Sequence, residues 1–324
     1  MDLSILIPSR NEEWLAETLK DMLAHMRGKT EIIVVIDGEM FPKELPEDPR
    51  ITIITHYKSR GQRAATNDAA RVAKGTYLMK ADAHTAWREG FDVDVVKCFK
   101  RLGDNITQVP AMRNLHVFDW VCADGHRRYQ SPSGPCTECG KPTEKDVVWI
   151  PKKSPLSVSY RFDHTLKFQY FKSWRNSPEY QAQLKENRYT ETMSLQGSCF
   201  AIHRDKYWEL NISDEEFGSW GQQGTEVACK TWLSGGRCIV NHRTWYAHLF
   251  RTQGGDFSFP YKQDNTQVEK AREMSRKLFL DNTWPQQKYP LSWLVDKFAP
   301  VPGWHDGKDE GMLEQIRKQP IVVK

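Results

Sequence analysis

No stretch of the 324-residue sequence reaches the roughly 20 consecutive apolar residues that a membrane-spanning helix requires. The sequence also lacks internal repeats and low-complexity runs, and its hydrophobic content of 39% is enough to bury a full core. These absences exclude a disordered chain and a repeat protein. They predict a soluble globular protein that has no membrane partner.

A strong excess of one charge is also absent. Lysine and arginine total 46 and aspartate and glutamate total 42, which gives a formal net charge of +4. A protein whose main task is to grip nucleic acid is usually more basic, although this charge does not oppose an anionic partner. The cysteines number seven, an odd count in a chain that shows no secretion signal, which favours a reducing, cytoplasmic location.

A glycine-rich turn is missing after the first apolar run, at residues 3–7. The dinucleotide sites of dehydrogenases and related nucleotide-binding enzymes need such a turn so that the backbone can approach a pyrophosphate. Here the turn reads Pro8-Ser9-Arg10-Asn11-Glu12. We therefore set aside a dehydrogenase or a methyltransferase as the function.

Apolar runs and helical patterns alternate through the first third of the chain. Short apolar runs at 31–36, 51–54 and 76–79 predict buried strands, and helical spacing predicts helices at 11–25 and 62–73. This alternation predicts an α/β fold with a parallel sheet of the nucleotide-binding type. Ligands of such sheets bind outside the carboxyl ends of the strands, where residues 81–84 are expected to lie.

The chain divides into four parts by composition. Residues 1–118 form the predicted nucleotide-sugar-binding half, and 119–153, which are rich in Pro, Gly and Cys and lack apolar periodicity, are predicted to be an inserted loop module. Residues 154–284 form the acceptor half of the same domain, with a strand at 194–202, a helix at 225–233 and a final helix at 268–280. Residues 285–324 are expected to be a tail packed on the core.

Asp82 and His84 lie two residues apart where a strand should end, so their side chains share one face. A carboxylate and an imidazole together suit manganese or another divalent first-row ion, and the open coordination positions would take phosphate oxygens. An isolated Asp-x-His pair also occurs by chance, so the pattern needs support from the rest of the chain.

That support comes from an ordered set of motifs that resembles glycosyltransferase family 2 in the first half and the polypeptide N-acetylgalactosaminyltransferases in the second. The first set is Ser4-Ile5-Leu6-Ile7-Pro8 with Asn11-Glu12, Asp37-Gly38, Arg60-Gly61-Gln62-Arg63-Ala64 and Asp82-Ala83-His84. The second set is Gln196-Gly197-Ser198-Cys199-Phe200, Trp220-Gly221, Glu226, Trp232-Leu233-Ser234-Gly235-Gly236, His248-Leu249-Phe250-Arg251 and Phe257-Ser258-Phe259-Pro260.

The resemblance implies a metal-dependent glycosyltransferase with the GT-A fold, a Rossmann-like, mixed and mostly parallel sheet flanked by helices. It implies a nucleotide-sugar donor, with a UDP-sugar favoured, and His248 as the third metal ligand beside Asp82 and His84. Residues 257–260 would belong to a mobile catalytic loop. The donor-binding residues that it implies are Pro8, Arg10, Glu12, Asp37, Arg60, Arg63, Asp82 and Arg251. A turn role for Asp37 and a core role for His248 remain as alternatives.

The candidate catalytic residues are Trp220, Gln223 and Glu226. Where the mucin-type enzymes carry a glutamate soon after Trp-Gly, this chain has Gln222-Gln223, and only the later acid, Glu226, is present. An inverting transferase needs a carboxylate to deprotonate the acceptor, whereas in a retaining one the leaving phosphate can take that proton. Glu226 could serve as the base or only cap a helix, and Trp220 could line the sugar pocket or the core.

The inserted module holds Cys122, His126, Cys136 and Cys139, in the pattern C-x3-H-x9-C-x2-C. Four sulfur and nitrogen ligands fit tetrahedral zinc, and a site filled entirely by protein is structural and not catalytic. The alternative is that the two closely spaced cysteines are paired or idle. We expect a structural zinc here.

The flanks of this module interleave basic and aromatic residues, which can contact phosphates and stack bases. This pattern motivates the hypothesis that the acceptor is a hydroxymethylated pyrimidine in DNA, as for some bacteriophage enzymes, which would place the protein in the host cytoplasm. The residues are Arg127, Arg128, Tyr129, Lys141, Lys145, Trp149, Lys152 and Lys153. The alternatives are an acceptor on a glycan, a lipid-linked sugar or a protein, and a non-catalytic module that binds nucleic acid or a sugar nucleotide.

Overall fold

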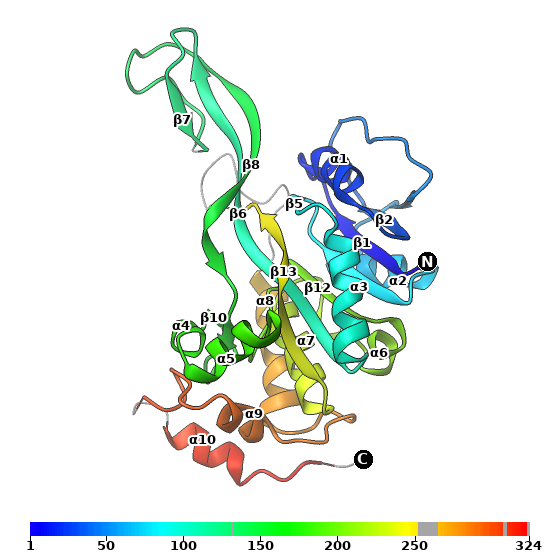
Figure 1. Cartoon of the computed structure of the whole chain (residues 1–324), viewed down its shortest axis with the longest axis vertical. Helices are drawn as coiled ribbons and strands as arrows, with labels where there is room; N and C mark the ends of the chain where they lie inside the picture. Colours follow the sequence, from blue (N-terminus) through cyan, green and yellow to red (C-terminus); the bar gives the residue numbers. More distant parts are fainter. Residues whose placement is uncertain (131, 252–264, 307–309, 323–324) are drawn as a thin grey trace.

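The computed structural model describes residues 1–130, 132–251, 265–306 and 310–322. In these residues the chain forms one large mixed sheet flanked by helices, from which a long hairpin projects (Figure 1). The predicted α/β class and helix-flanked mixed sheet are confirmed, although several strands are antiparallel and the sheet is less parallel than predicted. The strand order is β11-β13-β6-β12-β4-β1-β2-β3, with β5 paired to β13 and with β7 and β8 paired to β6.

The first half alternates strands and helices as its apolar runs predicted. Strands β4, β1, β2 and β3 pair in parallel, and every residue of β2 is buried, in keeping with its apolar run at 32–36. The carboxyl ends of β1, β2 and β4 therefore lie at one edge of the sheet. The elements are β1 (Leu3–Ser9), α1 (Leu15–His25), β2 (Thr30–Asp37), β3 (Ile51–His56), α2 (Gln62–Val72), β4 (Tyr77–Ala81), β5 (Thr85–Trp87) and α3 (Phe91–Leu102).

The second half completes the sheet on the other side of β4. Strand β12 lies antiparallel between β4 and β6, and β13 runs parallel to β6 and antiparallel to β5 and β11. The elements are β9 (Tyr160–Phe162), β10 (Phe168–Tyr170), α4 (Lys172–Arg175), α5 (Pro178–Asn187), β11 (Tyr189–Glu191), β12 (Cys199–His203), α6 (Arg204–Glu209), η1 (Glu215–Phe217), α7 (Gln223–Leu233) and β13 (Arg237–His248).

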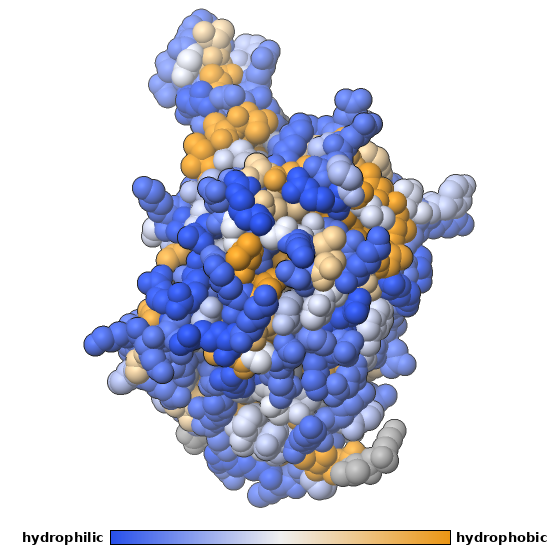
Figure 2. All heavy atoms as spheres, turned by 45° about the vertical axis from the view of Figure 1, so that its right-hand side comes forward, coloured by the Kyte–Doolittle hydropathy of each residue, from blue (hydrophilic) through white to orange (hydrophobic). Residues whose placement is uncertain are grey.

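The region predicted as an irregular loop module is instead the outer part of a β-hairpin. Strand β6 (Ile106–Cys122) and strand β8 (Thr143–Ser157) pair over most of their length, and the short β7 (Arg127–Tyr129) pairs with the end of β6. The expected boundaries at 118/119 and 153/154 fall inside these two strands. Apolar periodicity is weak in β8 because most of its residues are exposed or half-buried. Figure 2 shows the hairpin standing clear of the body of the molecule.

The C-terminal region packs on the core, as its aromatic content suggested. The predicted helix at 268–280 is present as α8 (Asn265–Ser275) continued by the π-helical turn η2 (Arg276–Leu280). It is not the final helix, because α9 (Leu291–Lys297) and α10 (Glu310–Arg317) follow it. Leu294, Phe298 and Trp304 are fully buried in the main hydrophobic cluster. Within the described residues, no helix has the length and apolar character needed to cross a bilayer.

Helix α7 is buried along its whole length, and Gly224 in its first turn allows the closest backbone approach. A Cβ added at Gly224 would lie 2.1 Å from the carbonyl oxygen of Leu195. We expect Gly224→Ala to lower the free energy of unfolding by about 1–3 kcal/mol, because backbone must move to relieve the overlap. Urea denaturation of the purified protein measures this change.

Gly311→Ala is the matched control, since nothing lies within 4 Å of the added methyl group in α10. It should leave stability unchanged or raise it by up to about 1 kcal/mol through the helix propensity of alanine. Equal stability of the two variants would contradict the packing described for α7.

Candidate metal and donor site

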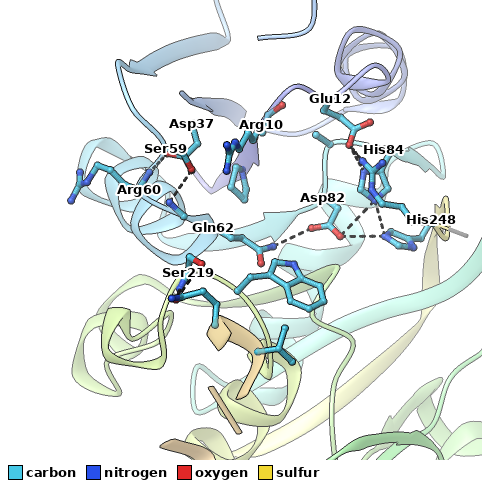
Figure 3. A pocket seen from close by; sticks show the side chains of 18 of the residues that line it. Arg10, Glu12, Asp37, Ser59, Arg60, Gln62, Asp82, His84, Ser219 and His248 are labelled. Atoms are coloured by element: carbon cyan, nitrogen blue, oxygen red, sulfur yellow. Dashed lines mark hydrogen bonds and ion pairs between the residues drawn. The ribbon is translucent and has the colours of Figure 1, made fainter. Parts of the chain in front are cut away.

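A cavity of about 740 Å³ opens where β1, β2 and β4 end, which is a volume typical of small-ligand sites (Figure 3). Most of the predicted donor-site residues line it. They are Pro8, Arg10, Glu12, Asp37, Arg60, Asp82, His84, Trp220, His248 and Arg251. Further lining residues had no predicted role in the site, and they include Ser59, Gln62, Ser219, Phe250, Gln267 and Val268. The predicted loop residues 257–260 lie outside the described residues.

Three of these side chains converge on one point. The Nε2 atoms of His84 and His248 are 3.1 Å apart, and Asp82 Oδ2 lies 3.2 Å from His248 Nε2 and 3.8 Å from His84 Nε2. Ligand atoms around an octahedral cation at about 2.1 Å are separated by roughly 3 Å, so this spacing fits a divalent ion. A cation at this point would accept the lone pairs of both imidazole nitrogens. These residues can therefore hold a cation such as manganese.

Glu12 orients one of these ligands from behind. Its Oε2 lies 3.0 Å from His84 Nδ1, which leaves His84 Nε2 facing Asp82 and His248 (Figure 3). Glu12 also forms an ion pair with Arg251. Burial alone would raise the pKa of Glu12, but the charges of His84 and Arg251 and the hydrogen bond with His84 outweigh it and lower that pKa. A carboxylate behind a metal-binding histidine fixes its tautomer and ring orientation.

Lys80 is a site residue that the sequence analysis missed. Its ammonium is fully buried, forms an ion pair with Asp82 and donates a 2.8 Å hydrogen bond to the carbonyl of Gly197. Burial acts to raise the pKa of Asp82, yet the charge of Lys80 and the hydrogen bond with His248 bring it well below its usual value. The signal was present in the sequence, because a lysine in an apolar strand two residues before Asp82 must point to the same face.

His248 is buried against Phe250, and this burial lowers its pKa to about 4. The second cause, its hydrogen bond with Asp82, acts in the opposite direction. The imidazole is thus held neutral, which is the form that binds a metal. The core role considered for His248 is compatible with this position, because the ring is buried and also faces the cavity.

Asp37 stabilises the turn after β3. Its two oxygens accept hydrogen bonds from His56, Ser59 and the backbone amides of Arg60 and Gly61, at 2.7–2.8 Å. Burial would raise the pKa of Asp37, but these donors lower it. Because four donors already fill its acceptor sites, the structure fits the turn role better than the predicted contact with a nucleobase or ribose.

Glu226 lies outside the cavity, so its predicted role as a catalytic base does not fit the structure. The carboxylate is fully buried; Oε2 accepts hydrogen bonds from Arg63 at 3.0 and 3.1 Å, and Oε1 accepts from Lys230 at 3.1 Å and from the Asp214 amide at 2.9 Å. Arg63 is 1% exposed and is held by this pair and by backbone carbonyls, so it does not reach the donor cavity either. A buried ion pair of this kind supports the fold around α7.

Gln223 and Trp220 take different positions. Gln223 is 6% exposed, lies outside the cavity lining and donates to Ser213 at 3.3 Å, so its predicted catalytic role is not supported by its position. Trp220 lines the cavity, in agreement with the predicted sugar or acceptor pocket. Sequence could not separate these cases because Trp220 belongs to the Trp-Gly motif and Gln223 lies two residues after it.

The four predicted zinc ligands come together at the tip of the hairpin. The Sγ atoms of Cys122 and Cys136 each lie 3.6 Å from His126 Nδ1, and those of Cys122 and Cys139 are 3.6 Å apart. Tetrahedral zinc with Zn–S bonds of about 2.3 Å and Zn–N bonds of about 2.0–2.1 Å separates its ligand atoms by roughly 3.5–3.8 Å. The backbone amides of Cys139 and Glu138 also lower the pKa of the Cys136 thiol to about 6.

The base of the hairpin packs on the residues beside Glu12. Trp14 stacks on Phe118 with ring centroids 6.0 Å apart and contacts Trp149, whose indole donates a 3.0 Å hydrogen bond to Asp21. Lys145 on β8 pairs with Glu13 at 3.0 Å. A separate hydrophobic cluster that joins β6, β13 and the start of α1 lies beneath these contacts. The hairpin is therefore anchored to the segment that orients His84.

The contact between Glu12 and His84 gives a direct test of the metal site. We expect Glu12→Gln to weaken Mn²⁺ binding by about 10–100-fold, because His84 loses the carboxylate that orients it. Titration with Mn²⁺, followed by electron paramagnetic resonance of the free ion, measures the affinity. Glu13→Gln is the matched control and should bind as the unmodified protein does, because Glu13 pairs with Lys145. Equal affinities in the two variants would refute the arrangement.

Comparison with known proteins agrees with this geometry. Residues 4–130 match the model for glycosyl transferase family 2. The chain is 27% identical over 275 residues to a putative polypeptide N-acetylgalactosaminyltransferase 9 of Drosophila melanogaster, which covers 80% of this chain and 36% of the relative. It is 27% identical over 114 residues to human polypeptide N-acetylgalactosaminyltransferase 3, which covers 34% of this chain and 17% of the relative. The chain thus spans about a third or less of these relatives.

Solved structures share the fold. GalNAc-T7, crystallised with UDP, GalNAc and Mn²⁺, superposes with a TM-score of 0.62 at 17% identity and covers 98% of this chain and 54% of that one. The S. aureus TarS fragment 1–349 in complex with UDP-GlcNAc gives a TM-score of 0.52 at 11% identity, over 92% of this chain and 71% of that one. The chain therefore shares the fold of these solved structures, the GT-A fold that its motifs predicted, and its residues 4–130 are similar to glycosyl transferase family 2.

Proposed function

We propose that this chain transfers a sugar from a UDP-sugar to a hydroxyl acceptor and that the transfer depends on a divalent cation. The observation that carries the proposal is the convergence of Asp82, His84 and His248 at the floor of a cavity at the carboxyl ends of β1 and β4. In open α/β sheets this edge is where nucleotides bind. UDP and Mn²⁺ are named with the structural relative GalNAc-T7, and UDP-GlcNAc with TarS, which supports this donor class and this ion.

Different residues of the cavity would bind different parts of the nucleotide-sugar donor. A bound cation would neutralise the charge that develops on the leaving diphosphate. Arg10, Arg60 and Arg251 line the same cavity, and guanidinium groups bind phosphate oxygens in paired hydrogen bonds. Trp220 and Phe250 supply apolar walls beside them. Glu12 holds both His84 and Arg251, so one carboxylate couples a metal ligand to a phosphate-binding group.

The carboxylates of the cavity favour transfer with retention of configuration. Among the described lining residues these are Glu12, Asp37 and Asp82, and each is already engaged by His84, by the turn at 59–61 or by the metal site. None is free to deprotonate an acceptor. In the proposed step the bond between the anomeric carbon and the β-phosphate oxygen breaks and the bond to the acceptor oxygen forms on the same face. The acceptor proton passes to the departing phosphate.

For the acceptor we propose a hydroxyl of a protein or a glycan, in line with the N-acetylgalactosaminyltransferase relatives. The argument for DNA is weaker than the sequence suggested, because three of the basic residues of the hairpin form ion pairs within the protein. Arg127 pairs with Asp119 and Asp146, Lys141 pairs with Asp124, and Lys145 pairs with Glu13. Only part of the expected phosphate-binding charge remains available.

Release of UDP from a panel of UDP-sugars tests the proposed function. We expect release that requires Mn²⁺ and that falls by roughly 10²–10³-fold in Asp82→Asn, because charge on the leaving group loses its stabilisation. Peptides, glycans and hydroxymethylated DNA are added in separate arms, and stimulation by DNA alone would contradict the acceptor proposed here. Turnover that is equal in Asp82→Asn and in the unmodified chain would overturn the metal-dependent mechanism.

We also propose that the cluster at the tip of the hairpin holds one structural zinc ion. Three sulfurs and one nitrogen at tetrahedral spacing form a closed site about which β7 and the turn at 136–140 are arranged. Elemental analysis of the purified chain should give one zinc per molecule, and Cys136→Ser should remove it. Cys98→Ala is the control, since Cys98 lies in the main core and should not change the zinc content. Zinc retained in Cys136→Ser would contradict this site.

A further inference from the structure

A second hollow, separate from the donor cavity, is lined by a ring of cations. Its volume is about 600 Å³, and the two hollows share no lining residue. The hollow lies between α3, the end of α5 and the middle of β13. The positively charged residues that line it are Arg88, Lys97, Arg101, Arg188 and Arg243, which come from four separate segments of the chain.

The charge of this ring is largely uncompensated. Asp94 is the one acid among the described lining residues, and it pairs with Arg88 at 2.5 Å and with Lys97 at 3.9 Å. Five cations and one carboxylate leave four positive charges, and the formal net charge of the whole chain is also +4. The remainder of the molecule is therefore balanced, and the excess charge is concentrated at this hollow. Such a concentration raises the local density of anions.

Two of the guanidinium groups are held in place by the protein. Arg243 donates a 3.1 Å hydrogen bond to the carbonyl of Asn187 and lies 5.3 Å from the centre of the Tyr189 ring. Arg188, in a left-handed conformation at the end of α5, donates to the carbonyl of His242 at 3.3 Å. Both acceptors are backbone carbonyls, so these bonds do not neutralise the guanidinium charges. Each guanidinium group also has further N–H donors for a ligand. Fixed guanidinium groups of this kind suit phosphate oxygens.

The shape of the hollow selects among anions. Its volume is that of a small-molecule site, which a compact ligand can fill. Single-stranded nucleic acid is bound on exposed aromatic rings that stack its bases, whereas the ring that lines this hollow, Tyr189, is 4% exposed and lies under Arg243. We propose that the hollow is a second anion site, which binds a compact ligand carrying two or more linked phosphate groups.

The hollow lies close in sequence to the proposed metal ligands, along β13 and after β5. Arg88 directly follows β5, whose Thr85 is paired with His248, and Arg243 precedes His248 by five residues on β13. At about 3.3 Å per residue, roughly 15 Å separates the hollow from the metal ligands. This distance is too long for one diphosphate to occupy both places. A ligand there would bind independently of the donor.

Calorimetric titration with tripolyphosphate in manganese-free buffer tests the site without any turnover. We expect Arg101→Glu combined with Arg243→Glu to weaken binding at least tenfold. The control, Lys74→Glu combined with Lys318→Glu, changes the net charge equally at two exposed positions elsewhere and should stay within about twofold of the unmodified chain. UDP binding in the presence of Mn²⁺ should be unchanged in both, which separates this site from the donor cavity.

Arg101→Ala provides a milder variant should the double reversal unfold, because Arg101 is an exposed residue that makes no ion pair within the described chain. It should still weaken tripolyphosphate binding several-fold with an unchanged melting temperature. Equal loss in the hollow and control variants would overturn the proposal in favour of a general charge effect. Binding of a DNA oligonucleotide but not of tripolyphosphate at the hollow would also overturn it.

Discussion

The pairing of β13 with β5 and β6 is the constraint on which the site depends. His248 is 164 residues from His84 in sequence, and the two meet because His248 lies opposite Thr85 in one ladder and opposite Asn114 in the other. The irregularity between Asn241 and Trp245 lets β13 keep both pairings along its outer part. A slip of one residue would turn the His248 ring to the opposite face of the sheet and leave two ligands in place of three.

The sequence predicts this domain well where one signal dominates. β1 and β2 contain continuous apolar runs at 5–7 and 32–36, and Asp82 and His84 follow a strand end at which chemistry is expected. The hairpin escaped prediction because β8 is mostly exposed and carries prolines and lysines, so neither strand nor helix periodicity shows in it. Its cysteine pattern was nevertheless readable, because four ligands at fixed spacing do not depend on burial.

The predictions for single side chains failed where the deciding partner was distant. Glu226 was a candidate catalytic base, with a helix cap as the alternative, because it follows a family motif, but Arg63, 163 residues away, donates hydrogen bonds to one of its oxygens. Asp37 was predicted to contact the nucleotide sugar. Its oxygens instead accept hydrogen bonds from the backbone of the turn that follows β3. No role was predicted for Lys80, because the role of a lysine within a buried strand becomes clear only from its ion pair with Asp82.

The length of β6 has a consequence for how such a domain can vary. The strand begins inside the main sheet, passes His248 at Asn114 and continues to Cys122, so its inner part belongs to the main sheet and its outer part to the hairpin. Tryptophan contacts and the Lys145–Glu13 pair hold the hairpin where it leaves the body of the protein. Changes in the length or sequence of the hairpin beyond these contacts alter its tip and leave its base in place. The sequence of the tip can therefore change while Asp82, His84 and His248 keep their positions.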